Sequence, residues 1–234
     1  MLRNALARSR ALLREEGLFS LLRHTVAFAG VFGKRVYRRR DVFLYHHHLR
    51  ERDATAFQPR LAEFEHRVVE SNAQADELAA SGYEDFRQLF LFSTRNLSRG
   101  AVAFCVYAGW RLAHIGWVAM SGTSKQCVDP YPFDVEFERG EACTGGTYTV
   151  PEFRGKGLMA YGYYERFEYL RRLGYTSSRN SVELSNASSQ RAHAKFSPEI
   201  VGTGRFTRVL FWSRWTEHPF PDGPHIGMPP APGK

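Results

Sequence analysis

The chain has little cysteine, and its three cysteines are not spaced as a recognisable pair. Cys105, Cys127 and Cys143 make an odd total and include no C-x-x-C motif. A disulfide framework or a cysteine zinc site needs more cysteines at closer spacing. We therefore expect a protein of a reducing compartment, the cytoplasm, whose cysteines are small core residues or free thiols.

The sequence also lacks an apolar run that could span a bilayer. The uncharged stretch at residues 25–33 is far shorter than the roughly 20 residues of a transmembrane helix. Glu15 and Glu16 interrupt the basic region before it, and no small-residue cleavage site stands out, which argues against a secretory signal peptide. Any membrane contact is thus expected to be peripheral, on the inner face of the membrane.

Acidic residues are scarce at the start of the chain, and this shortage accounts for the whole positive charge. Residues 1–40 hold ten Lys or Arg against two Glu, a net charge of +8 that equals that of all 234 residues. Apolar residues recur there at helical spacing, namely Leu18, Leu22, Val26 and Ala29. This pattern predicts a basic amphipathic extension that lies on an anionic membrane surface. A helix packed on the domain or in a homodimer contact is the alternative, while no reading motif supports nucleic-acid binding.

The rest of the chain has enough apolar residues for one sizeable α/β domain. Hydrophobic residues make up 43% and aromatic residues 14% of the sequence. Strands are predicted at 41–49, 64–70, 101–110, 112–120, 181–185 and 206–215, with a hairpin that turns near Gly109, and helices at 75–80, 83–92 and 158–173. On the last helix the spacing of Tyr163, Phe167, Leu170 and Leu173 predicts one core-facing side. The Pro- and acid-rich segment at 129–141 is interpreted as a rim of the substrate site. Beyond residue 217 the chain is rich in Pro and Gly, and we expect a mobile tail.

Two glycines stand at an informative place, in a basic turn between a strand and a helix. Gly155-Lys156-Gly157 follows Arg154 and precedes a helical pattern that begins at Leu158. Glycine adopts left-handed backbone angles and leaves room for close approach. The backbone N–H groups and the partial positive charge of a helix N-terminus bind anions, and Arg154 and Lys156 add charge. The turn is therefore predicted to bind a pyrophosphate.

Two alternatives compete with this interpretation. Residues 155–160 also fit the dinucleotide fingerprint G-x-G-x-x-A. Against it, the preceding segment Thr147–Thr149 is half polar, and fewer than 80 residues remain after Gly157, too few for several more βα units. A purely structural turn without a ligand is the second alternative.

A second motif follows about thirty residues later. After the predicted strand at 181–185 comes Asn186-x-x-Ser-x-x-x-His-x-Lys. Together with the turn at 151–157, this motif resembles the GNAT superfamily of acetyl-CoA-dependent N-acetyltransferases, over roughly residues 64–215. The resemblance implies an α/β fold with a mixed, mostly antiparallel central sheet flanked by helices. The domains would then be an extension at 1–41, a GNAT-like domain at 42–216 and a tail at 217–234.

The resemblance also implies a binding site for coenzyme A. Its pyrophosphate would be bound by the turn residues Arg154, Gly155, Lys156, Gly157 and Leu158. The backbone of Tyr148, Thr149 and Val150 would align the pantetheine arm and polarise the thioester carbonyl, and Asn186 and Ser189 would lie beside the cofactor. Such an enzyme transfers the acetyl group of acetyl-CoA, or another short acyl group, directly to a primary amine without a metal.

Three residues are candidates for catalysis. A Glu near the motif-bearing strand often takes the amine proton in this family, which makes Glu141 the first candidate and Glu183 the second. His193 stands where the family often has a Tyr that protonates the departing thiolate, and histidine can do this near neutral pH. The alternatives are structural or surface carboxylates, and a histidine that packs its helix.

The triplet His46-His47-His48 is a further polar cluster. Alternate residues of a strand point to opposite faces, so the three side chains cannot meet one metal ion. No partner carboxylate or cysteine is evident from the sequence, and we expect no metal site there.

These observations together predict an acyltransferase that acts on an amine. The basic extension suggests an acceptor at the membrane surface, such as an amino sugar or a glycolipid precursor. The alternatives are a catalytically silent acyl-CoA sensor or recruitment module, and a membrane scaffold that works through residues 1–40.

Overall fold

The structure, a computed structural model, describes residues 37–229 of the chain. These residues fall into two compact units: residues 41–204 and 216–229 belong to the larger, and residues 37–40 and 205–215 to the smaller. Most of the predicted basic extension lies outside the described residues. All the residues of the candidate site belong to the larger unit.

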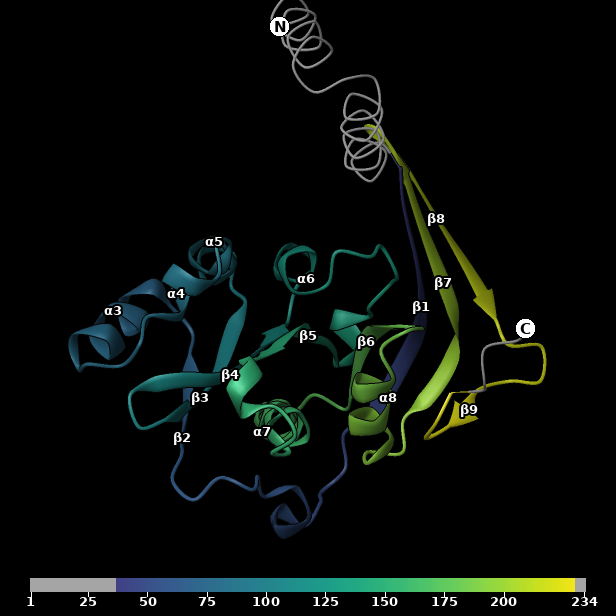
Figure 1. Ribbon diagram of the computed structural model, residues 1–234. Coiled ribbons are helices and arrows are strands. Elements are labelled where there is room, and N and C mark those ends of the chain that lie inside the picture. The colour runs from purple at the N-terminus through teal and green to yellow at the C-terminus, as the bar shows by residue number, and fades with distance from the viewer. Residues whose placement is uncertain (1–36, 230–234) are drawn as a thin grey trace, which may run out of the picture. The chain divides into compact units, whose positions relative to one another are not determined.

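The strands and helices follow one another in a mixed α/β order (Figure 1). The strands are β1 (Tyr37–His48), β2 (Glu65–Val69), β3 (Val102–Ala108), β4 (Arg111–Ala119), β5 (Glu141–Thr149), β6 (Ser177–Glu183), β7 (Glu199–Val209), β8 (Trp212–Pro219) and β9 (His225–Ile226). The helices are α3 (Asn72–Ala80), α4 (Phe86–Leu89), α5 (Ser93–Ser98), α6 (Gly122–Val128), α7 (Leu158–Arg172) and α8 (Ala187–Ala194). Short 3-10 turns lie at η1 (Ala54–Phe57), η2 (Phe137–Arg139) and η3 (Pro151–Phe153).

The strands form one mixed sheet in the order β2-β3-β4-β5-β6-β1-β7-β8, with β9 paired to β7. Neighbours are antiparallel at β1/β6, β2/β3, β3/β4, β4/β5 and β7/β9, and parallel at β5/β6. Figure 1 shows α6 and α7 on opposite sides of the central strands. The predicted fold class, a mostly antiparallel sheet flanked by helices, is confirmed.

The core confirms two local predictions. The β3–β4 hairpin turns at Gly109, which has a φ of +58°, and β3 is buried from Val102 to Tyr107. On α7, Tyr163, Phe167 and Leu170 contact the core, as the helical spacing predicted, whereas Leu173 is 54% exposed at the C-cap of the helix. Gly174 follows with a φ of +87°. Burial of one face of α7 against the sheet is therefore what holds this helix in place.

The parallel strands β5 and β6 stay together over only three residue pairs. Their register runs from Glu141↔Ser177 to Cys143↔Arg179, and no pair follows. On its other side β5 continues along β4 as far as Thr149, with a register shift between Ile115 and Trp117. The second halves of β5 and β6 therefore have unpaired edges that face a common space.

Several predicted boundaries are wrong. Of the helix predicted at 83–92 only α4 is helical. The strand predicted at 206–215 is two strands, because β7 ends at Val209 and Leu210 has a φ of +55°. The domain limits stay predictions; they fall within β1 and β8, and β9 of the predicted tail pairs with β7. Among residues 37–229, no helix has both the length and the apolar character that crossing a membrane requires.

Candidate active site

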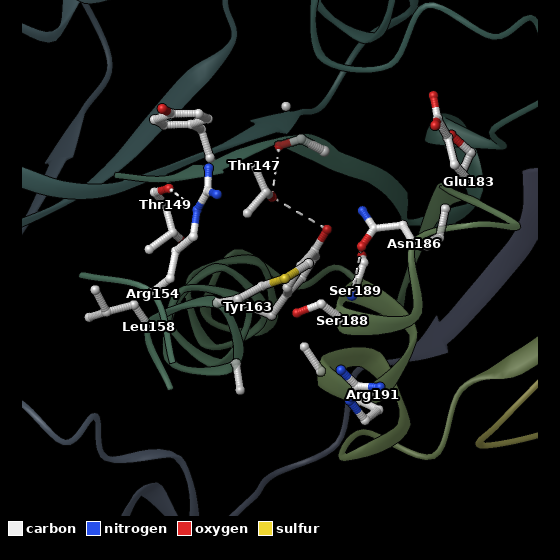
Figure 2. A pocket seen from close by; sticks show the side chains of 18 of the residues that line it. Thr147, Thr149, Arg154, Leu158, Tyr163, Glu183, Asn186, Ser188, Ser189 and Arg191 are labelled. Carbon is white, nitrogen blue, oxygen red and sulfur yellow. Dashed lines mark hydrogen bonds between the residues drawn. The ribbon is translucent and has the colours of Figure 1, made fainter. Parts of the chain in front are cut away.

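A cavity of about 810 Å³ lies where β5 and β6 diverge. Its walls are residues 145–149 of β5, the turn before α7, residues 181–183 of β6 and the first half of α8. Figure 2 shows Arg154 and Leu158 on one side of this cavity and Asn186 on the other. The two predicted motifs, about thirty residues apart in sequence, thus line the same space.

The turn before α7 needs both of its glycines. Gly155 and Gly157 have φ values of +75° and +86°, angles that strain any residue with a Cβ. Arg60 holds the turn from outside the motif, because its backbone N–H donates to Lys156 O at 2.8 Å and its Nη2 to Gly155 O at 2.8 Å. In a trans peptide the N–H points away from the carbonyl, so fixing these two carbonyls also fixes the direction of the next two N–H groups.

The turn leaves a row of backbone donors without acceptors. The first helical bond of α7 runs from Tyr161 N to Gly157 O at 3.1 Å, and Gly157 gives no side-chain cap. Within the part of the chain that the structure describes, the N–H groups of residues 155–160 donate to no protein acceptor. Because the helix dipole adds partial positive charge here, this row is suited to bind an anionic oxygen.

Basic side chains surround the cavity, although not every predicted one. Arg154 lies over the ring of Tyr148, 6.0 Å from its centroid, and its Nε donates to Thr149 O at 3.2 Å. Arg60, Arg191 and Lys195 also line the cavity. Lys156 does not, since its Nζ lies 5.4 Å from the ring centroid of Phe153.

The strand residues of the motif differ in what they offer. Val150, predicted to bind the cofactor through its backbone, already donates its N–H to Ala113 O at 3.0 Å and does not line the cavity. Thr149, one position earlier, directs its carbonyl away from β4 to Arg154, because successive residues of a strand alternate in direction. Of the three predicted strand residues, Tyr148 and Thr149 therefore line the cavity and Val150 does not.

Helix α8 begins at the far side of the cavity. Asn186 caps it, since its Oδ1 accepts from Ser189 N at 3.1 Å. Asn186, Ser189 and Glu183 all line the cavity, as predicted for a site beside the cofactor, and their roles stay predictions. The cavity thus has the N-terminus of a helix on each side, α7 and α8.

The sequence interpretation missed the polar function of Tyr163. Its periodicity assigned Tyr163 to the core face of α7, but the side chain also lines the cavity. Its hydroxyl accepts from Asn180 Nδ2 at 3.3 Å and from Thr147 Oγ1 at 3.5 Å, and Figure 2 shows it directed toward Thr147. Helical spacing predicts the face of the helix on which a tyrosine ring lies. It does not predict which groups the hydroxyl at the end of that ring contacts.

His193 is not placed to act as the predicted acid. It is fully buried behind the cavity, where its Nε2 accepts from Asn180 Nδ2 at 3.1 Å and its Nδ1 lies 3.0 Å from His47 Nε2. Burial and then the charge of Arg166 lower its pKa to about 3. A neutral histidine that cannot reach the cavity has no proton for a departing thiolate, so its role is the packing alternative.

Glu141 also lies outside the cavity, contrary to its predicted role as the base. Its carboxylate accepts from Glu136 N at 2.8 Å, and lies 3.1 Å from Arg179 Nε and 3.2 Å from His46 Nε2. Burial alone would raise its pKa, but the Glu136 bond and the charges of Arg179 and His46 outweigh burial and lower the pKa. Glu141 is therefore a paired structural carboxylate.

Asp129 is a carboxylate of the cavity that the sequence did not single out. Its Oδ2 accepts from Ser181 Oγ at 2.6 Å and its Oδ1 from Tyr131 N at 3.0 Å. Burial raises its pKa, more than the bonds from Ser181 and Tyr131 lower it. The sequence showed only an acid-rich segment before β5, which we interpreted as a rim of the substrate site.

No family model matches the chain, and no curated protein matches it. Solved structures do. A GCN5-related N-acetyltransferase from Sphaerobacter thermophilus has 12% identity and a TM-score of 0.46 over 82% of this chain and 56% of its own. A GCN5-related N-acetyltransferase from Kribbella flavida has 14% identity and a TM-score of 0.39 over 76% and 62%. A conserved protein of unknown function from Staphylococcus epidermidis has 11% identity and a TM-score of 0.45 over 78% and 65%.

These structures include members of the superfamily that the two motifs resemble. The chain spans less than two thirds of the length of each of the three. At such low identities and TM-scores these structures do not indicate what this chain does. Its activity is inferred below from the geometry of the cavity alone.

Proposed function

We propose that the protein is an acyltransferase that uses acetyl-CoA, or another short acyl-CoA, as cosubstrate and acylates a primary amine. One observation carries the proposal: the row of free N–H groups at the start of α7 opens on a cavity that continues to Asn186. The N–H row and the basic side chains around it suit a pyrophosphate. The space between the separated strands suits an extended arm with its thioester toward α8.

The cavity holds the groups that direct acyl transfer needs. The amine nitrogen bonds to the thioester carbon as the carbon–sulfur bond breaks. Asp129, or Glu183 as the second candidate, takes the proton that the amine loses. The Tyr163 hydroxyl gives a proton to the departing thiolate, the role first predicted for His193. Burial raises the pKa of the Asp129 carboxyl group, which strengthens this carboxylate as a base and favours Asp129.

The first test is binding to the full-length protein. Acetyl-CoA at saturating concentration should raise the melting temperature, because a ligand that binds only the folded state stabilises it. Desulfo-CoA, which keeps the pyrophosphate, should do the same, and acetyl-pantetheine, which lacks it, should not. Equal stabilisation by acetyl-pantetheine would contradict the assignment of the N–H row, and no stabilisation at all would favour the scaffold alternative.

The second test is catalysis. Release of free thiol from acetyl-CoA in the presence of a panel of primary amines, amino sugars included, should exceed the rate without an amine. Binding without thiol release from any acceptor would favour the sensor. Asp129→Asn and Glu183→Gln should then differ, and the variant that loses turnover while keeping stabilisation by acetyl-CoA identifies the base.

The acceptor is proposed to lie at a membrane surface, as a glycolipid or its precursor. The support is the charge of residues 1–40 in the sequence. The full chain should sediment with anionic vesicles at low salt and less so at high salt, and should not sediment with neutral vesicles. Equal sedimentation with both kinds of vesicle would contradict an electrostatic contact.

A further inference from the structure

The histidine triplet lies on β1, and strand alternation divides it between two faces. His47 points into the core, where it is 1% exposed and contacts His193. His46 and His48 share the other face, with ring centroids 4.6 Å apart. Three adjacent histidines cannot meet one metal, as predicted, but two alternate ones can.

The missing carboxylate comes from a distant part of the sequence. Glu199, the first residue of β7, places its Oε1 3.0 Å from His48 Nε2 and its Oε2 3.4 Å from His46 Nδ1. The ligand atoms of these three residues all lie within 4.8 Å of one another. Two ligands at about 2.0–2.1 Å from a tetrahedral ion are separated by roughly 3.3 Å. Both measured distances are close to this value but run to different oxygens of Glu199, so a shared ion requires a rotation of this carboxylate or both of its oxygens.

The second nitrogen of His46 is also positioned. His46 Nε2 lies 3.2 Å from Glu141 Oε1, and Glu141 is in turn held by Arg179 Nε, Glu136 N and Ser177 Oγ. His46 Nε2 makes no hydrogen bond among the described residues, and Glu141 is the carboxylate beside it, so a small rotation of the ring gives the carboxylate–histidine–metal arrangement with Nδ1 deprotonated and directed outward. This is an observation independent of the three ligand distances.

We propose that His46 Nδ1, His48 Nε2 and Glu199 bind one Zn²⁺ ion, with Glu141 as the residue that positions His46. Two imidazoles and a carboxylate suit zinc and its neighbours in the transition series, and do not suit Mg²⁺ or Ca²⁺, which take oxygen ligands. A fourth position is left for water or for an exogenous ligand.

The ion would join β1 to the start of β7, two segments about 150 residues apart in the chain. None of its ligands lines the acyl-CoA cavity. The expected consequence is therefore stability, because an ion that binds only the folded protein adds its binding free energy to that of folding. Without a metal, His46 and His48 only hydrogen-bond to Glu199, and zinc uptake distinguishes this arrangement from a metal site.

Calorimetric titration of the full chain, produced without a polyhistidine tag and stripped with a chelator, tests the proposal. ZnCl₂ should bind at one ion per chain and raise the melting temperature, and MgCl₂ should do neither. His48→Ala and Glu199→Gln should each weaken Zn²⁺ binding at least about 100-fold. Glu141→Gln should weaken it by about 10- to 100-fold, the usual range for a group that orients a ligand.

Two matched variants control for other sites. His218→Ala removes an exposed histidine and Glu138→Gln an exposed carboxylate, and neither should change zinc binding. Circular dichroism of each zinc-free variant checks that it is folded. Absence of uptake by the parent chain, or uptake that His48→Ala and Glu199→Gln leave unchanged, would overturn the proposal.

Discussion

The cavity at the start of α7 and the histidine pair behind α8 are both built from polar groups, yet only the cavity is open to a ligand. At the turn, the N–H groups of residues 155–160 have no acceptor among the described residues. Behind α8, the rings of His193 and His47 bond to each other, and Asn180 donates to His193. Both clusters contain groups that could bind a ligand. They differ in whether their polar atoms already form hydrogen bonds within the protein.

Tyr163 lies between the two clusters and belongs to both. Its ring centroid is 4.2 Å from that of His193, while its hydroxyl reaches Thr147 at the cavity wall. The apolar part of the side chain thus seals the buried cluster, and the polar tip faces the ligand side. Aromatic residues with a hydroxyl suit such a boundary.

The largest expected effect is at the turn. Gly157→Val should abolish stabilisation by acetyl-CoA, because valine is strained at a φ of +86° and the N–H row would shift. Gly174→Val is the matched control: Gly174 has a φ of +87° at the other end of α7 and no atom within 4 Å of an added Cβ. Melting with and without acetyl-CoA is the measurement. Loss of the ligand effect in both variants would mean that strain in α7, and not the turn, is responsible.

The next effect is on turnover. Tyr163→Phe should lower kcat about 100-fold, at the low end of what a positioned acid contributes, and leave the affinity for acetyl-CoA unchanged. Tyr161→Phe removes a hydroxyl from the same helix without touching the cavity, and should keep kcat. Steady-state thiol release measures both. Similar kcat values for the two variants would remove Tyr163 from the mechanism.

A smaller effect, on stability, is expected at the buried pair of His193 and His47. His193→Gln should lower the free energy of unfolding by about 1–3 kcal/mol, because His47 and Asn180 lose a buried partner. At temperatures well below melting, kcat should stay within a few-fold of the parent. Urea unfolding and thiol release are measured on the same sample. A large fall in kcat with unchanged stability would restore His193 as the acid.

The last expected effect is the pH dependence of stability. Burial and then Arg166 lower the pKa of His114, like that of His193, to about 3, against about 6.5 when unfolded. Between these values the unfolded chain binds more protons, so stability falls as the pH is lowered from 6.5. Each histidine contributes up to about 1.4 kcal/mol per pH unit. Urea midpoints at pH 7, 6 and 5 measure the slope, which His193→Gln should reduce and the surface change His218→Gln should not.

The parts predicted best from the sequence are local. The glycine turn, the hairpin around Gly109 and the apolar face of α7 depend on angles and periodicities within a few residues. Such features follow from steric and hydrophobic preferences of neighbouring residues. The short helix α4 was predicted too long and α5 was not predicted, because the ends of such helices depend on packing and not on a sustained period.

The site residues that were predicted wrongly share one cause. Val150, Glu141 and His193 stand at motif positions, but each already bonds to a group far along the chain: Ala113, Arg179 and His47. Asp129 and Glu199 were overlooked for the converse reason, since only the fold brings them to Ser181 and to His48.

By itself the sequence determined the glycine turn, the two faces of the histidine strand and the uneven charge, because backbone angles, side-chain alternation and ionisation are properties of short segments. Only the tertiary structure decided which polar groups remain available. A backbone N–H group binds a ligand only if no other part of the protein has satisfied it, and burial and long-range hydrogen bonds decide which N–H groups stay available.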